Sequence, residues 1–160
     1  MALKAVEDNP TSEIARALLP VVRVLNQVRA HEEFCRKAGV GIDRAGAAVL
    51  YKLHVEGENA RLTDLAERLG IDPPAVTRKV QQLERDGLLC RSVDPRDARA
   101  CRLKLTRQGR TCIERLLRAR DEWLAELLVG WSRSDQKELA RLLQLFASTI
   151  EHDLEARNGH

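Results

Sequence analysis

One segment of the sequence, residues 72–87, gathers side chains that can read nucleic-acid bases. If the segment is a helix, about 100° separates successive residues, and Val76, Val80 and Leu83 share one side. The opposite side carries Pro74, Arg78, Gln81, Gln82 and Arg85. This side has no acid, and arginine and glutamine can pair bidentately with guanine and adenine in the major groove of DNA. The segment therefore predicts a base-contacting helix.

The borders of this face carry residues with other predicted roles. Thr77 and Lys79 lie on its flanks, where a hydroxyl and an ammonium suit phosphate contacts. Glu84 and Asp86 fall toward the C-terminal end, away from the start of the helix that is expected to enter the groove. The alternative interpretation is a generic polar helix surface, which usually mixes acids with bases.

A second basic group follows between residues 88 and 106, where the apolar period shortens toward two. Apolar and basic residues alternate over residues 101–105, which predicts a half-buried strand. Residues 88–93 are its predicted hairpin partner, and residues 94–99 form the polar turn between them. The segment therefore predicts a two-stranded ribbon with a charged tip.

Two arginines, Arg96 and Arg99, lie in the predicted turn. An arginine at the tip of a ribbon can enter a narrow minor groove, where the negative potential of DNA is enhanced. Asp94 and Asp97 would repel DNA if they faced it, so we expect them to pair with neighbouring arginines and hold the turn in shape. An ordinary charged hairpin turn is the alternative interpretation.

The distribution of charge agrees with these two segments. The whole chain of 160 residues has a net charge of +3. Residues 61–120 contain 15 Lys and Arg against 8 Asp and Glu, whereas residues 1–60 are neutral and residues 121–160 have a net charge of −4. A basic middle between neutral and acidic ends indicates that the middle meets a polyanion.

A helix-turn-helix is predicted to position residues 72–87. Thr63 is expected to cap a helix that ends at Gly70, and Asp72 to cap the next, with Pro73 at its first position, where a missing N–H costs nothing. The motif also needs a small residue, a glycine turn and an apolar plug, which are present in order as Ala66, Gly70 and Val76.

Further helices are predicted on both sides of this motif. One is expected over residues 10–37, bent or delayed at Pro20, and Asp43 caps a shorter one. Thr106 and Ser134 are predicted to start two C-terminal helices. Two apolar stripes follow the terminal helices: Ile14, Leu18, Val21, Leu25 and Val28, and Leu139, Leu143, Phe146, Ile150 and Leu154. The stripes can cover each other or a second copy of the chain, and we expect a homodimer.

The cysteines and histidines do not show metal-binding spacing. The cysteines, Cys35, Cys90, Cys101 and Cys112, form no C-x-x-C pair and are predicted to be small buried hydrophobes, with a redox-sensing thiol as the alternative. The histidines, His31, His54, His152 and His160, are scattered along the chain. We therefore expect no metal and no cofactor.

Other classes of function lack support in the sequence. No nucleophile–base pair, phosphate-binding loop or cluster of acids and histidines indicates an enzyme. No stretch approaches about 18 uninterrupted apolar residues, so no membrane span is predicted. The first ten residues lack the apolar core of a secretory signal, and a cytoplasmic location is expected.

The order of these elements resembles the MarR family of bacterial regulators over nearly the whole chain. The most specific parts are the helix-turn-helix from Leu62 to Leu88, the string Asp94-Pro95-Arg96-Asp97-Ala98-Arg99 and the motif Leu105-Thr106-x-x-Gly109. The resemblance implies a mainly α fold with a small β-hairpin wing. It further implies, within a single domain 1–160, a winged helix-turn-helix lobe at residues 43–107 that is flanked by dimerisation helices at residues 9–40 and 108–157.

The same resemblance implies roles for individual segments. Residues 72–87 would be the recognition helix, and Arg96 would be the wing-tip arginine, positioned by Asp94, Asp97 and Arg99. Many family members bind small aromatic acids between the dimer helices and the DNA-binding lobe.

The sequence thus predicts a regulator that binds double-stranded DNA. We expect it to be a repressor that binds a pseudo-palindromic operator as a homodimer and is released by a small ligand. Two alternatives stay open: a redox-responsive regulator that uses a cysteine, and a winged-helix module that binds proteins and never touches nucleic acid.

Overall fold

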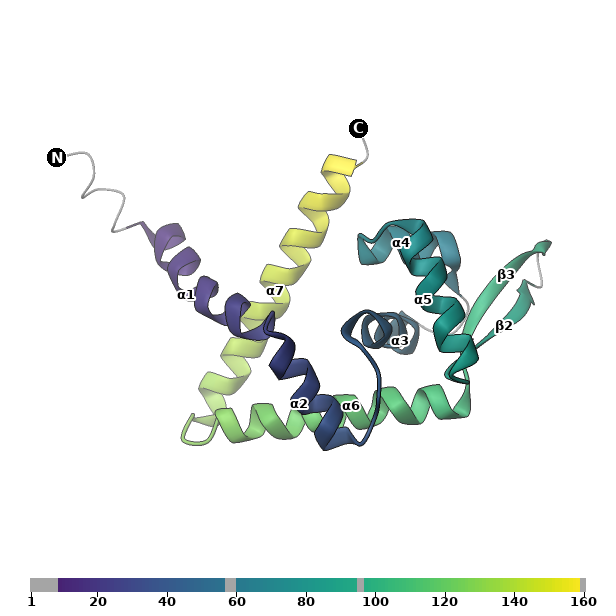
Figure 1. Cartoon of the computed structure of the whole chain (residues 1–160). Helices are drawn as coiled ribbons and strands as arrows, with labels where there is room; N and C mark the ends of the chain where they lie inside the picture. The colour runs from purple at the N-terminus through teal and green to yellow at the C-terminus, as the bar shows by residue number, and fades with distance from the viewer. Residues whose placement is uncertain (1–8, 57–59, 95–96, 159–160) are drawn as a thin grey trace. The chain divides into compact units, whose positions relative to one another are not determined.

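The computed structural model describes residues 9–56, 60–94 and 97–158 and shows a mainly helical protein with a small antiparallel sheet (Figure 1). The chain divides into two compact units, Met1–Arg120 and Asp121–His160. The described elements are α1 (Pro10–Leu25), α2 (Val28–Ala38), α3 (Arg44–Glu56), β1 (Ala60–Arg61), α4 (Leu62–Leu69), α5 (Pro73–Arg85), β2 (Leu89–Asp94), β3 (Asp97–Leu105), α6 (Arg107–Leu127) and α7 (Arg133–Asn158). The predicted fold class, mainly α with a small wing, is confirmed.

The helix-turn-helix consists of α4 and α5, as predicted. Gly70 adopts the left-handed conformation, with φ at 60°, and so ends α4. Ala66 and Val76 are 2% and 1% exposed, so both are buried in the core. The small side chain of Ala66 lets the two helices approach closely. Asp72 caps α5 because its side chain accepts a hydrogen bond from the N–H of Ala75 at 3.3 Å.

The start of α4 differs from the prediction. The helix begins at Leu62, and Arg61 occupies the N-cap position without a side-chain cap, so the prediction that Thr63 caps it is wrong. The physical reason is strand pairing. β1 pairs with β3 through Arg61, which keeps this residue extended, and the helix follows immediately.

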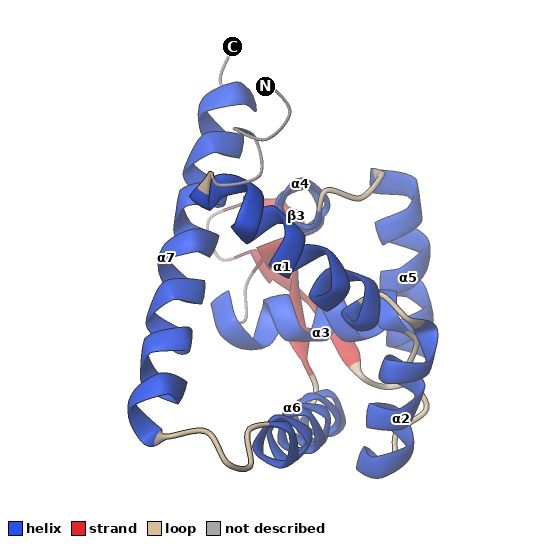
Figure 2. Ribbon diagram, turned by 90° about the vertical axis from the view of Figure 1, so that its left-hand side faces the viewer, coloured by secondary structure: helices blue, strands red, loops and turns tan. Residues whose placement is uncertain are grey.

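The sheet has the order β1-β3-β2, and Figure 2 shows its strands beside α3. Leu103 and Leu105 of β3 are 2% and 3% exposed, which confirms the predicted alternation. The strands extend further than predicted, since Asp94 pairs with Asp97, and the predicted turn at residues 94–99 is therefore too long. Polar composition indicates a loop, but charged side chains do not prevent backbone pairing between strands.

The predicted N-terminal helix is two helices, α1 and α2, so the single helix over residues 10–37 is wrong. Pro20 lies inside α1, and the break comes later, after Asn26. The Arg44 guanidinium donates hydrogen bonds to the Asn26 backbone carbonyl and to Asn26 Oδ1, at 3.3 and 2.8 Å. This long-range contact stabilises the end of α1 at a place where the sequence carries no glycine or proline.

Side chains cap three other helices, α3, α6 and α7. Asp43 caps α3, since its Oδ1 accepts from the N–H of Gly46 at 2.8 Å, as predicted. Thr106 caps α6 in the same way through Gly109, at 3.0 Å. The last helix, α7, begins at Arg133, one residue before the predicted start at Ser134, and its cap is Ser132, whose hydroxyl accepts from the backbone N–H of Asp135.

The link between the sheet and α6 explains the Leu-Thr-x-x-Gly motif. The Thr106 hydroxyl donates to the carbonyl of Gly87 at 2.6 Å, and its backbone N–H donates to the carbonyl of Leu88 at 3.1 Å. Gly109 packs directly on this junction, and a Cβ there would lie 2.0 Å from the Leu88 carbonyl oxygen. The glycine is therefore required by close backbone approach.

Replacing this glycine should destabilise the protein strongly. Gly109→Ala should lower the free energy of unfolding by about 3 kcal/mol, because backbone atoms must move to relieve the overlap. Urea denaturation followed by circular dichroism measures the change. Gly41→Ala is the matched control, since a Cβ there meets nothing within 4 Å, and it should change stability by less than about 1 kcal/mol. Equal stability of the two variants would contradict the close approach.

Candidate nucleic-acid interface

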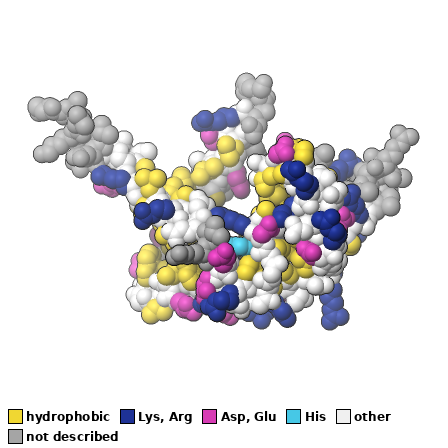
Figure 3. Space-filling model, in the orientation of Figure 1, with side chains coloured by type: hydrophobic (Ala, Val, Ile, Leu, Met, Phe, Trp, Pro, Cys, Tyr) yellow, Lys and Arg dark blue, Asp and Glu magenta, His cyan; other side chains and the backbone are white. Residues whose placement is uncertain are grey.

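The apolar side of α5 is buried and its polar side is exposed, as the helical projection predicted. Val76, Val80 and Leu83 are at most 2% exposed. The exposed side consists of Pro74, Arg78, Gln81, Gln82 and Arg85. We call these five exposed residues the α5 polar face. Lys and Arg side chains are visible over α5 and the adjacent strands (Figure 3).

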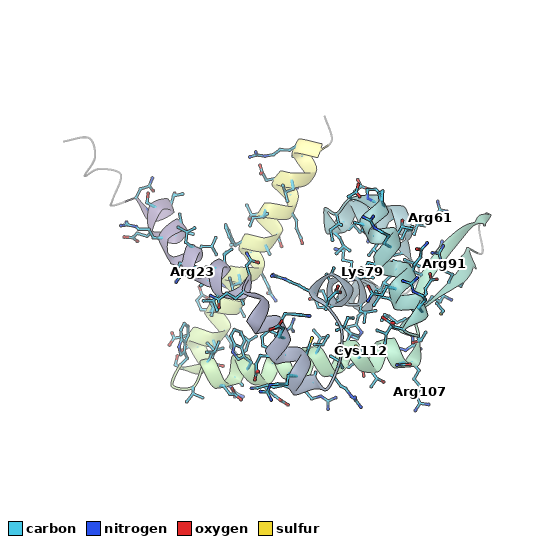
Figure 4. The ribbon with its side chains drawn as sticks, in the orientation of Figure 1. Arg23, Arg61, Lys79, Arg91, Arg107 and Cys112 are labelled. Atoms are coloured by element: carbon cyan, nitrogen blue, oxygen red, sulfur yellow. The ribbon has the colours of Figure 1, made fainter. Side chains whose placement is uncertain are left out.

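The two predicted phosphate-contacting residues, Thr77 and Lys79, are half-buried and hydrogen-bonded within the chain. The Thr77 hydroxyl donates to the carbonyl of Pro73 at 2.8 Å. The Lys79 ammonium lies 2.5 Å from Asp43 Oδ2, at the start of α3, and 2.9 Å from Gln82 Oε1 (Figure 4). The ammonium is therefore directed toward α3 as well as along its own helix.

The carboxylate of Asp43 is charged at neutral pH. Its partial burial raises the pKa, but hydrogen bonds from Lys79 and from the N–H of Gly46 outweigh burial, and the pKa lies below its usual value. Asp43 therefore makes two contacts: Oδ1 caps α3, and Oδ2 pairs with Lys79.

The acid at the C-terminal end of α5 is also paired. Glu84 accepts two hydrogen bonds from the Arg91 guanidinium of β2, at 2.8 and 3.2 Å. This bidentate contact joins α5 to the wing and compensates a negative charge close to the α5 polar face. Arg91 points toward α5 in Figure 4.

The wing tip can be located only in part. Arg96 lies outside the described residues, and for Asp94, Asp97 and Arg99 the structure describes the backbone but not the side chains. The backbones of Asp94 and Asp97 are paired at the end of the ribbon. The predicted roles of these four residues stay predictions.

The described cysteines differ in environment. Cys35 and Cys112 are 9% and 8% exposed, as predicted, whereas Cys90 is exposed, so its predicted burial is wrong. Cys90 follows the buried Leu89 in β2, and successive side chains of a strand point to opposite faces, so the Cys90 side chain is exposed. The side chain of Cys101 lies outside the description.

The two buried thiols are held in their protonated form. Burial raises the pKa of Cys35 and of Cys112, and the proximity of the two cysteines raises that of Cys112 further. The Cys35 thiol lies 3.2 Å from the carbonyl of Ile42 and donates to it. A protonated thiol is a weak nucleophile, so these two environments do not favour peroxide sensing.

An open hollow of about 630 Å³ lies beside the C-terminal end of α5. Asp86 and Leu88 line it from the α5–β2 junction, and α6 contributes Arg107, Thr111 and Arg115 at helical spacing. The segment between α2 and α3 closes another side through residues 39–41. Its walls therefore combine two guanidinium groups and the carboxylate of Asp86 with apolar surface.

Neither a metal cluster nor a membrane span is found in the described part of the chain. No group of three or more His, Cys, Asp or Glu side chains within it is arranged to hold a metal ion. None of its helices is long and apolar enough to cross a bilayer.

Comparison with known proteins places the chain among regulators. The MarR family profile matches residues 44–101, from the start of α3 into β3. The HTH-type transcriptional regulator YdgJ of Bacillus subtilis is 30% identical over 116 residues, which are 72% of this chain and 70% of YdgJ. The chain belongs to the MarR family of transcriptional regulators.

Solved structures share the fold of this chain. A MarR family protein from Bacillus stearothermophilus is 21% identical, with a TM-score of 0.77 over 88% of this chain and 95% of that one. A variant of the S. aureus protein MepR, bound to an oligodeoxyribonucleotide, is 19% identical, with a TM-score of 0.57 over 89% and 99% of the two chains. These similarities confirm the winged helix-turn-helix fold.

In this MarR family member, two interactions next to the α5 polar face could not be predicted from the sequence. The sequence predicts Asp43 only as a cap, because a lysine 36 residues later carries no signal of pairing. The pair between Glu84 and Arg91 depends on where β2 folds back against α5. In both interactions, a cation neutralises an acid that lies close to the α5 polar face.

The state of the buried thiols can be measured with a thiol reagent. In a Cys90→Ser/Cys101→Ser variant, dithionitrobenzoate should label Cys35 and Cys112 at least about a hundredfold more slowly in the native protein than in urea, because both are buried and protonated. DNA binding of this variant should also be insensitive to hydrogen peroxide. Rapid labelling in the native state, or loss of DNA binding with peroxide, would favour the redox-responsive alternative.

Proposed function

We propose that this chain is a transcriptional repressor that binds duplex DNA sequence-specifically as a homodimer. In this proposal α5 enters the major groove and the wing reaches the adjacent minor groove. The observation that carries the proposal is the α5 polar face, which presents arginine and glutamine and no acid. A dimer of this kind that covers a promoter excludes the polymerase, which favours repression over activation.

The charges around the α5 polar face support a polyanionic partner. The nearby acids Asp43 and Glu84 are both paired with cations from the same unit of the chain. Paired acids repel phosphate less than free ones, so the net potential of the surface stays positive. The MepR variant shows that a protein of the same fold binds an oligodeoxyribonucleotide.

The distribution of exposed apolar side chains argues against a protein-docking lobe. Among the side chains that the structure describes, no large hydrophobic one is exposed between Val55 and Leu124, a span that includes α5 and parts of both wing strands. Protein interfaces usually have an apolar or aromatic centre, and the α5 polar face has none. DNA therefore remains the better partner for this surface.

Dimerisation is supported by the terminal helices, each considered by itself. No described residue of α1 is buried, although Ile14, Val21 and Leu25 are 57%, 51% and 48% exposed. On α7, Leu143 and Leu154 are each 53% exposed. Apolar faces of this extent on a single chain usually mark an interface.

A two-fold dimer fixes the form of the operator. The two α5 helices would enter successive major grooves about 34–36 Å apart, one turn of DNA. We therefore propose a pseudo-palindromic site whose two halves each contact one α5.

The hollow beside α5 is the proposed site for a releasing ligand. Arg107 and Arg115 would bind a carboxylate, and the apolar surface next to Leu88 would hold an aromatic ring. The volume of about 630 Å³ is suitable for a small organic acid. Because Asp86 and Leu88 follow α5 directly, a ligand in the hollow would contact the C-terminal end of that helix.

DNA binding can be tested by gel shift with DNA from upstream of the protein's own gene. Arg78→Ala should relax base preference at one position of each half-site, by about 1–3 kcal/mol of discrimination. Arg96→Ala should weaken binding to all sequences more uniformly and reduce the salt slope by about 0.9 for each lost phosphate contact.

Arg36→Ala is the control, because it removes an exposed arginine of α2 that pairs with Glu33. Its affinity and base preference should match those of the wild type. Sedimentation of the same preparations should give a dimer. If Arg78→Ala and Arg96→Ala bind every duplex as the wild type does, or if the wild-type chain is monomeric, the proposal fails.

The ligand site can be tested by thermal unfolding with benzoate as the first probe. A ligand at a hundred times its Kd should stabilise the wild type by about 2.7 kcal/mol and release DNA in a gel shift. Arg115→Gln should abolish both effects, whereas Arg118→Gln, also exposed on α6 but outside the lining of the hollow, should retain them. Equal responses of the two variants would place the ligand elsewhere.

A further inference from the structure

A continuous set of contacts runs from the start of α3 to the α5 polar face. Asp43 Oδ1 accepts from the N–H of Gly46 at 2.8 Å, which fixes the carboxylate on the first turn of α3. Its other oxygen lies 2.5 Å from the ammonium of Lys79, and that ammonium lies 2.9 Å from Gln82 Oε1. A residue outside α5 is thus connected through one lysine to an exposed amide.

The position of Asp43 is itself well determined. The preceding residue, Ile42, accepts hydrogen bonds at its carbonyl from His31 Nε2 at 2.9 Å and from the Cys35 thiol at 3.2 Å. Both donors belong to α2, so the segment before α3 is attached to a second helix. Asp43 is therefore a fixed partner, and Lys79 is held at a side chain that is only 18% exposed.

The contact with Lys79 decides which way the Gln82 amide faces. An ammonium has only hydrogen-bond donors, so it must meet the amide oxygen and not the amide nitrogen. The nitrogen of Gln82, with its two donor hydrogens, is then directed away from Lys79. A glutamine without this contact can turn over and present its oxygen and nitrogen together, as pairing with adenine requires.

We propose that Asp43 and Lys79 are positioning residues for sequence reading: they orient Gln82 so that its amide donates to base acceptors, while neither of them touches a base. The bases favoured at this position carry acceptors in the major groove, such as guanine with O6 and N7 or thymine with O4. This inference rests on the proposed DNA-binding function.

The inference differs measurably from a phosphate contact by Lys79. A lysine that neutralises phosphate contributes affinity to all sequences and increases the salt dependence of binding. A lysine that orients Gln82 contributes to the choice of base at one position. The two roles therefore separate into a change in base preference and a change in salt slope.

The experiment compares the base preferences of variants on a duplex library randomised around the half-sites that the wild type selects. Asp43→Asn keeps an oxygen that can cap α3 but removes the charge that holds Lys79. We expect it to shift preference toward adenine, by about fivefold or more, at the same base pair that Gln82→Ala affects. Lys79→Gln should cause the same shift with an unchanged salt slope.

Coupling between the residues provides a second readout. In an Asp43→Asn/Gln82→Ala double variant, the base preference should equal that of Gln82→Ala alone, because Asp43 acts only through Gln82. Glu33→Gln is the matched control: it also converts an acid of an ion pair to an amide, on the exposed surface of α2, and should leave base preference unchanged. Circular dichroism confirms that each variant is folded.

Three results would overturn the inference while the proposed function stands. One is an unchanged base preference in Asp43→Asn, and another is an equal loss of affinity for all sequences in that variant. The third is a salt slope reduced by about 0.9 in Lys79→Gln with base preference intact, which would make Lys79 a phosphate contact. Absence of any sequence-dependent DNA binding by the wild type would instead defeat the proposed function itself.

Discussion

The structure of the lobe depends on the burial of one side of α5. Val76, Val80 and Leu83 are removed from water almost completely, and each such side chain contributes about 1.5–3 kcal/mol before entropy is subtracted. This burial fixes the rotation of the helix about its axis. Because the α5 polar face lies opposite the buried side, the same packing that stabilises the lobe exposes arginine and glutamine to solvent.

Acidic side chains close to a surface that binds a polyanion repel it unless they are paired. This chain pairs Glu84 with Arg91 of the wing and Asp43 with Lys79, and it uses Asp72 as a helix cap. The two paired acids also hold α5 in place, since the pairs connect it to β2 and to α3. The electrostatics of the surface and the position of the helix are therefore set by the same contacts, which makes α5 sensitive to changes in its neighbours.

The hollow beside α5 and the Asp43 side chain meet this helix at different places. Asp86 and Leu88 at the hollow follow the C-terminal end of α5, whereas Asp43 reaches α5 in its middle, through Lys79. In the functions proposed for them, one region changes the affinity for DNA and the other changes the choice of base. The protonated state of Cys35 and Cys112 is consistent with a role for these residues in packing.

The sequence alone determined the local features: the two sides of α5, the turn at Gly70, the caps Asp72 and Thr106, and the strand alternation up to Leu105. These follow from periodicity and from hydrogen bonds between residues close in the chain. Only the tertiary structure decided the break after Asn26, the early start of α4, and the partners of Asp43 and Glu84. Each of these depends on a residue that is distant in sequence or on strand pairing, and a pattern within one segment contains no information about which distant groups will meet it.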